Sequence, residues 1–146
     1  MTPFELIGKA NGLHVLQDAC AVIPHYQGIS GATRRAWARE NRDTLTAFIG
    51  GYLDALKWLY APENRAAACT LLAERVPNMG PPLAAATCGV LLAEKGGFDR
   101  EARLDEQGMR AVLALRSEYG RPNKVLTDPH AYCDPSYYER ALERMS

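Results

Sequence analysis

The sequence lacks most of the features that assign a protein to a class at first sight. Lys+Arg and Asp+Glu balance at 17 residues each, so neither a basic surface for nucleic acid nor an acidic tail is indicated. No apolar run approaches the ~20 residues of a membrane span. The first residues, MTPFELIGKA, lack the basic and apolar regions of a secretory signal. If the chain is complete as given, we expect it to stay in the cytoplasm and to bind small neutral partners or none.

The usual motifs of catalysis are also missing. The chain has no nucleophile elbow, Walker loop, dinucleotide fingerprint or metalloprotease helix. Its cysteines, Cys20, Cys69, Cys88 and Cys133, contain no CxxC pair, and His130 with Cys133 offers one ligand pair without a second. We therefore expect no enzyme, no catalytic residue, no metal and no cofactor. We also expect free thiols that pack as small apolar side chains, with no disulfide.

Helical periodicity is the strongest signal that is present. Between Asp43 and Ala61 the apolar residues recur at spacings of three and four, which predicts a core helix that ends before Pro62. Gly50 and Gly51 lie in its middle, where each glycine costs roughly 1 kcal/mol relative to alanine. Their presence favours close approach of another backbone, with a bound ligand as the alternative.

The remaining segments predict an α/β protein that is rich in helix. Further helices are expected over residues 3–10, 35–41, 63–76, 82–95, 105–119 and 136–145. Short β-rich runs at 13–17 and 19–23, followed by an extended crossover at 26–33, predict one to three strands near the N-terminus. The expectation is thus about six helices behind a small sheet in a single domain over residues 1–146.

Two polar pairs have both a functional and an ordinary interpretation. Arg34 and Arg35 could hold an anion, although arginines at a helix start are more often solvated. Tyr137 and Tyr138 could stack on an aromatic ligand, although tyrosines at helical spacing near a C-terminus more often dock the helix. We favour the ordinary interpretation for both pairs.

Several segments, taken in order, resemble one family. They are PFELIGKANG near the start, VIPHYQG, the pattern R-x-W-A-x-x-N-x-D-x-L, then GYLDALKWLYAPENRAAA, and finally LTDPHAYCDPSYYERAL. This order resembles the carboxy-terminal part of solute-binding proteins of ABC transporters, in the NMT1/THI5-like group that handles pyrimidine precursors and sulfonates. The resemblance extends over nearly the whole chain.

The resemblance implies the carboxy-terminal portion of a type II periplasmic-binding-protein fold. Residues 1–33 would form the end of lobe two and the return crossover, and residues 34–146 the helices of lobe one. The implied function is to bind a small organic solute in the periplasm and to deliver it to an ABC permease. The site would use Phe4 and Tyr26 as stacking faces and Gln27 and Ser30 as hydrogen-bonding groups.

Two alternatives to solute binding stay open. The chain could be an α-helical interaction or scaffold module, because helices without the sheet they normally cover expose apolar stripes and favour a homodimer. It could also resemble the thiamin-pyrimidine synthases of the same superfamily, in which a histidine and a cysteine cluster matter. The dispersed cysteines make that enzyme the less favoured alternative.

Overall fold

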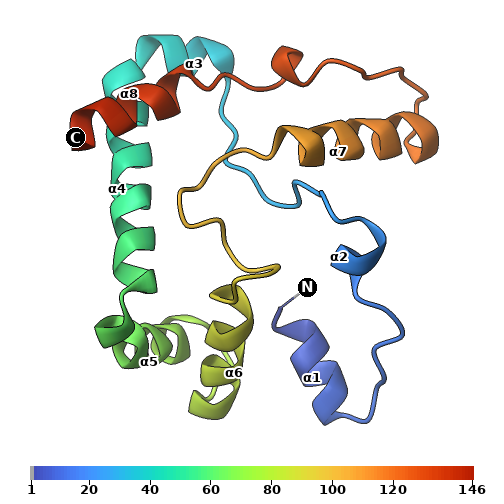
Figure 1. The fold of residues 1–146 in the computed structure, drawn as a ribbon, viewed down its shortest axis with the longest axis vertical. Helices are drawn as coiled ribbons and strands as arrows, with labels where there is room; N and C mark the ends of the chain where they lie inside the picture. Colours follow the sequence, from blue (N-terminus) through green and yellow to red (C-terminus); the bar gives the residue numbers. More distant parts are fainter. Residues whose placement is uncertain (1) are drawn as a thin grey trace. The chain divides into compact units, whose positions relative to one another are not determined.

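The computed structural model describes residues 2–146, and helices account for 61% of these residues. Figure 1 shows these helices joined by irregular segments, without a strand among the described residues. No helix in residues 2–146 is long and apolar enough to cross a membrane. The elements are α1 (Phe4–Ala10), α2 (Ala19–Val22), α3 (Arg35–Glu40), α4 (Arg42–Tyr60), η1 (Pro62–Asn64), α5 (Arg65–Arg75), α6 (Pro81–Leu91), α7 (Glu106–Tyr119), η2 (Pro129–Ala131) and α8 (Ser136–Met145).

The prediction of an α/β fold is wrong. A type II periplasmic-binding-protein fold requires strands, and none of the one to three expected near the N-terminus forms within residues 2–146. Residues 13–17 are irregular, and the second β-rich run forms the short helix α2 instead. A strand is stable only beside another strand or under a covering layer. The side chain of Leu16 is 95% exposed, so this run has no such cover.

The helix predictions are confirmed with small shifts at the ends. Gly12 follows α1 with a φ of +82°, in the left-handed region expected of a glycine after a helix. The helix expected over 82–95 ends early, at Leu91, where the Phe98 N–H bonds to the Leu91 carbonyl at 2.8 Å. The chain folds back here because residue 97 is a glycine: a Cβ at this position would lie 2.3 Å from the Ala93 carbonyl oxygen.

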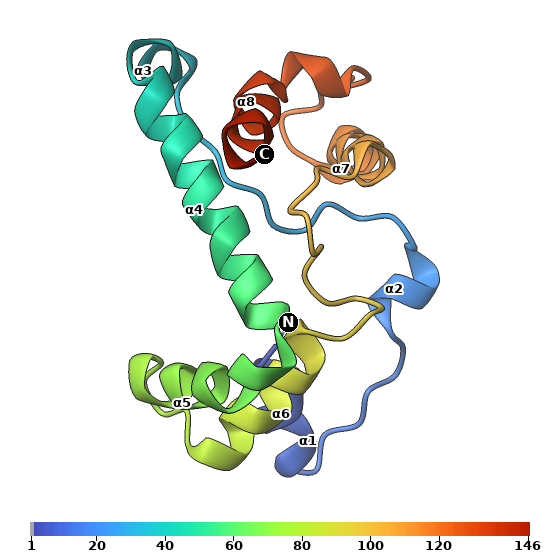
Figure 2. The ribbon, with the colours of Figure 1, turned by 60° about the vertical axis from the view of Figure 1, so that its left-hand side comes forward.

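By its internal contacts the chain divides into two compact units, which we describe separately. Unit 1 contains residues 2–18 and Ala55–Ala102, with α1, the end of α4, η1, α5 and α6. The α5–α6 pair is its centre, and α1 packs on α6 (Figure 2). Ala68 of α5 and Ala84 of α6 are buried, so small side chains let the helices approach closely. The single domain over 1–146 stays a prediction.

Unit 2 contains Ala19–Asp54 and Arg103–Ser146, with α2, α3, the start of α4, α7, η2 and α8. Its elements are joined by polar contacts over long sequence separations. Asp43 of α4 pairs with Arg144 of α8 at 2.6 Å, and Arg35 of α3 donates to the carbonyl of Ala131 in η2. Leu113 of α7 and Ala141 of α8 are buried in this unit.

The prediction for the paired glycines of α4 is not confirmed. A Cβ on Gly50 would meet only the Met145 sulfur at 3.9 Å, and a Cβ on Gly51 would meet nothing within 4 Å. No backbone therefore lies close against the glycine face within the described residues. Gly51 simply weakens the helix, by roughly 1 kcal/mol relative to alanine.

Candidate functional site

The segment that follows α2 docks on the first turn of α7, and Gln27 is the residue that fixes it. The side-chain carbonyl of Gln27 accepts the Asp105 backbone N–H at 2.9 Å. Its amide group donates to the Ile29 carbonyl at 2.7 Å. The bond from the Asp105 N–H pairs a backbone donor that has no partner within α7. The bond to the Ile29 carbonyl stabilises the turn that follows Gln27. Gln27 is half-buried, and both ends of its amide are engaged.

A second contact joins His25 to the same helix start. The His25 Nδ1 lies 3.0 Å from the Asp105 carboxylate, with both side chains partly exposed. The backbone N–H of Gly108 lowers the pKa of Asp105 most, followed by the His25 side chain. An anion at the amino end of a helix is stabilised by the unpaired N–H groups there. Asp105 therefore anchors the segment as a carboxylate.

Gly108 lets the docked backbone come close to α7. A Cβ on Gly108 would lie 2.7 Å from the Gln27 nitrogen and 3.1 Å from the Tyr26 carbonyl carbon. Gly108 itself is buried. Gly108 and Asp105 were not predicted to be partners of the crossover. No short-range signal could have found them, because 78 residues separate Gln27 from Asp105.

Tyr26 stands out from this docked segment. Its side chain is 55% exposed, and its ring lies beside Gly28, where a Cβ would be 3.4 Å from two ring carbons. The Gly28 N–H bonds back to the Tyr26 carbonyl at 2.9 Å, which forms a tight turn around Gln27. The Tyr26 backbone is thus fixed by the turn to Gly28 and by the hydrogen bonds of Gln27, while the Tyr26 side chain can be reached from solvent.

Two of the four predicted site residues, Tyr26 and Gln27, are adjacent in the sequence and lie in the anchored turn. Ser30 lies farther along the same irregular segment and is exposed. Phe4 belongs to unit 1, at the start of α1, where its side chain is 68% exposed. The roles of these four residues as a ligand site stay predictions.

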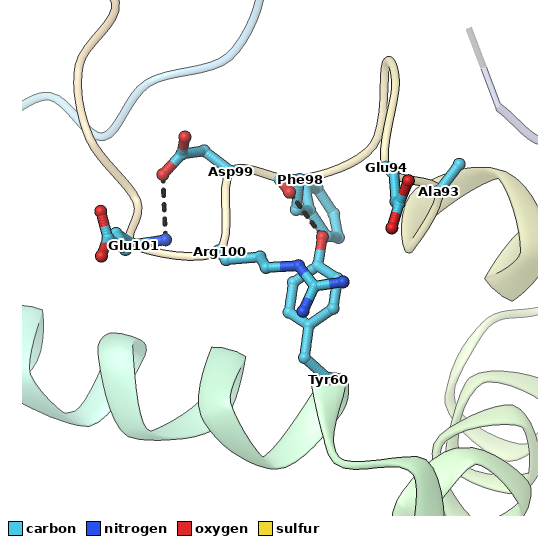
Figure 3. A pocket seen from close by; sticks show the side chains of 7 residues that line it. All are labelled: Tyr60, Ala93, Glu94, Phe98, Asp99, Arg100 and Glu101. Carbon is cyan, nitrogen blue, oxygen red and sulfur yellow. Dashed lines mark hydrogen bonds between the residues drawn. The ribbon is translucent and has the colours of Figure 1, made fainter.

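Unit 1 contains an open hollow that the sequence analysis missed (Figure 3). It has a volume of about 570 Å³ and is lined by Tyr60, Ala93, Glu94, Phe98, Asp99, Arg100 and Glu101. The Tyr60 hydroxyl donates to the Phe98 carbonyl, and the Arg100 guanidinium lies 4.5 Å from the Tyr60 ring centroid. Three carboxylates beside one guanidinium make the hollow net negative, so it does not suit an anionic solute.

The structure does not test whether the two polar pairs bind a ligand, so both interpretations stay predictions. Arg35 donates to the Ala131 carbonyl, a contact within unit 2. Tyr137 and Tyr138 are half-buried on α8. In residues 2–146, no group of three or more His, Cys, Asp and Glu side chains is arranged to hold a metal ion.

Comparisons with protein-family models, curated proteins and solved structures found no match to this chain.

Proposed function

We propose that the chain acts in the substrate-binding component of an ABC importer, where it contributes to holding a small organic solute such as a pyrimidine precursor or a sulfonate. The proposal includes delivery to the permease from the periplasm. The proposal is supported by the segments that, in their order along the chain, resemble solute-binding proteins. One of them, VIPHYQG, contains the aromatic ring of Tyr26 and the amide of Gln27.

The observation that carries the proposal is the anchored turn at Tyr26. A stacking residue works best when its backbone is fixed before the ligand arrives, because less conformational entropy is then lost on binding. Gln27 fixes the backbone beside Tyr26 by two hydrogen bonds. Tyr26 as a residue remains 55% exposed, so an aromatic or apolar part of a solute can lie against its ring.

The test is a calorimetric titration of the chain with aromatic pyrimidines and with aliphatic sulfonates. We expect one of the two classes to bind. Tyr26→Ala should then weaken Kd about two- to tenfold, the range of one aromatic contact, and Tyr26→Phe should retain most of the affinity.

Tyr132→Ala is the matched control. Tyr132 is also a tyrosine of unit 2 and is likewise 55% exposed, but it lies outside the anchored turn. Its replacement should leave Kd unchanged. If no member of either solute class binds, or if Tyr132→Ala weakens binding as much as Tyr26→Ala does, the proposal is wrong.

A second candidate, an α-helical interaction module, is favoured by the area of exposed surface. The accessible surface is 10,867 Å² for 16.1 kDa. A folded monomer of this mass exposes about 7,400 Å², and two separate domains of half the mass expose about 8,900 Å² together. The excess includes large apolar side chains such as Phe48 of α4, which is 71% exposed. Such surface favours association with another polypeptide.

Sedimentation velocity at micromolar concentration tests this second candidate. A homodimer, the simplest closed assembly, should form and should reduce the binding of a hydrophobic dye. Phe48→Ser should shift the equilibrium toward monomer. A compact monomer that binds no dye would exclude the interaction module and would leave solute binding to be judged by calorimetry alone.

A further inference from the structure

Two cysteines lie on the helices at the centre of unit 1. Cys69 belongs to α5 and Cys88 to α6, and a loop of residues 76–80 joins the two helices. The helices pack directly on each other, and they lie side by side in both Figure 1 and Figure 2. A short connection between packed helices makes a helical hairpin, in which residues at equal distances from the loop lie at the same level.

The positions of the two cysteines satisfy that condition. Cys69 precedes the last residue of α5, Arg75, by six positions, and Cys88 follows the first residue of α6, Pro81, by seven. At about 1.5 Å of rise per residue, the two cysteines stand about 9 and 10.5 Å from the ends of their helices at the loop. Ala84 and Cys88 on α6 are both buried, so this face of α6 is turned into the unit.

Cys69 is also a neighbour that acts on the Cys88 thiol. Burial is the larger cause that raises the Cys88 pKa to about 11, and the nearby Cys69 side chain adds to it. Cys69 is half-buried and Cys88 is buried, so a reagent in solution reaches Cys69 more readily. The other two cysteines, Cys20 and Cys133, belong to unit 2.

We infer that Cys69 and Cys88 are a disulfide-forming pair that braces the α5–α6 hairpin covalently under oxidising conditions. The oxidant is a small disulfide such as oxidised glutathione. The Cys69 thiolate attacks one glutathione sulfur, the S–S bond breaks, and one reduced glutathione leaves. The Cys88 thiolate then attacks the Cys69 sulfur of the mixed disulfide and releases the second glutathione. Two thiols are oxidised, one disulfide is reduced, and both thiol protons end on glutathione.

This inference is independent of the proposed function, because it needs only the two thiols and a disulfide oxidant. All four cysteines are free thiols in the structure. The inference concerns the chain after oxidation and departs from the expectation that no disulfide forms, which rested on the lack of a short-range cysteine pair and of an export signal. The pair was invisible in the sequence because its spacing spans a whole helical hairpin rather than a short motif.

The experiment is peptide mapping after equilibration in a buffer of oxidised and reduced glutathione. Free thiols are blocked, and the chain is cut with trypsin without reduction. Each cysteine then lies in its own peptide, over residues 10–34, 66–75, 76–95 and 125–140. We expect the linked product of peptides 66–75 and 76–95 to dominate. The same oxidation in concentrated guanidinium should spread the linkages over all pairings.

Thermal unfolding supplies the second measurement. Closing the loop between the two cysteines should raise Tm by about 5 °C or more in oxidising buffer relative to reducing buffer. Cys69→Ser should abolish the rise, whereas Cys20→Ser, the matched control in unit 2, should keep it. A native chain that yields no 66–75 to 76–95 linkage, or yields it no more often than the unfolded chain does, overturns the inference.

Discussion

The first turn of α7 and the middle of α4 both contain a glycine inside a helix, and the two glycines are there for different reasons. At Gly108 the backbone of the docked segment lies so close that a Cβ would be 2.7 Å from the Gln27 nitrogen. At Gly51 a Cβ would meet nothing within 4 Å. One glycine is required by packing, and the other is a position where the helix is weaker than it could be.

The local sequence does not show which glycine of a helix is required by packing. Gly50 and Gly51 attract attention because they are paired and lie in the longest helix, yet no close contact requires Gly51. Gly108 attracts none, because it is a single glycine near a helix start. What distinguishes the positions is a chain segment that is distant in sequence, and local patterns contain no information about it.

The largest effect is expected for Gly108→Ala. The new methyl group would collide with backbone atoms of residues 26 and 27, which cannot move aside as a flexible side chain could. We expect a loss of about 2 kcal/mol or more in the free energy of unfolding, despite the better helix propensity of alanine. Urea unfolding followed by circular dichroism measures it. A variant as stable as the parent would show that the segment does not dock as described.

Gln27→Ala should have the next largest effect. Losing both side-chain hydrogen bonds leaves the Asp105 N–H without its partner, at a cost of about 1–2 kcal/mol. The exposed Gln17→Ala is the control and should change stability by less than about 0.5 kcal/mol. Because Gly108→Ala and Gln27→Ala undo the same docking, the double variant should lose less than the sum of the two. Strict additivity would mean that the two residues act in separate structures.

The sequence predicted those parts of the molecule that depend on neighbours along the chain. The long apolar stripe between Asp43 and Ala61 locates a helix whose observed bounds agree closely with the prediction, and the helices expected over 3–10 and 105–119 form as well. The expected strands failed because strand formation depends on partners that a short apolar run such as residues 13–17 does not specify. Tyr26 and Gln27 were selected by resemblance alone. The anchoring of Gln27 by Asp105 emerged only with tertiary structure.

Gly51→Ala should act in the opposite direction to Gly108→Ala. The methyl group enters open space on an exposed helix position, so the helix gains about 0.5–1 kcal/mol in stability. Gly89→Ala in α6 is a parallel case, since a Cβ there also meets nothing within 4 Å. Both variants should unfold at higher urea concentration than the parent. A loss of stability at Gly51 would indicate that another chain or a ligand occupies the glycine face.

The smallest expected effect is electrostatic and belongs to the docked segment. The Gly108 N–H and then the His25 side chain lower the pKa of the Asp105 carboxyl from its ordinary 3.8, so the folded state favours the charged form. This contribution is complete above the ordinary pKa and is lost as the pH falls below it toward the folded pKa. Because the Asp105 side chain is 41% exposed, solvent screening keeps the contribution to about 0.5 kcal/mol or less.

Asp105→Asn isolates this contribution, since the asparagine keeps the size and the hydrogen-bonding oxygen of the side chain but cannot ionise. At neutral pH and low salt the variant should be slightly less stable than the parent, and added salt should narrow the difference. Below pH 3.8 the two stability curves should converge, because the parent carboxyl becomes neutral too. Urea unfolding across this range provides the measurement. A gap that persists at acidic pH would assign the loss to altered hydrogen bonding at the start of α7, and the charge of Asp105 would then have no part in holding the segment.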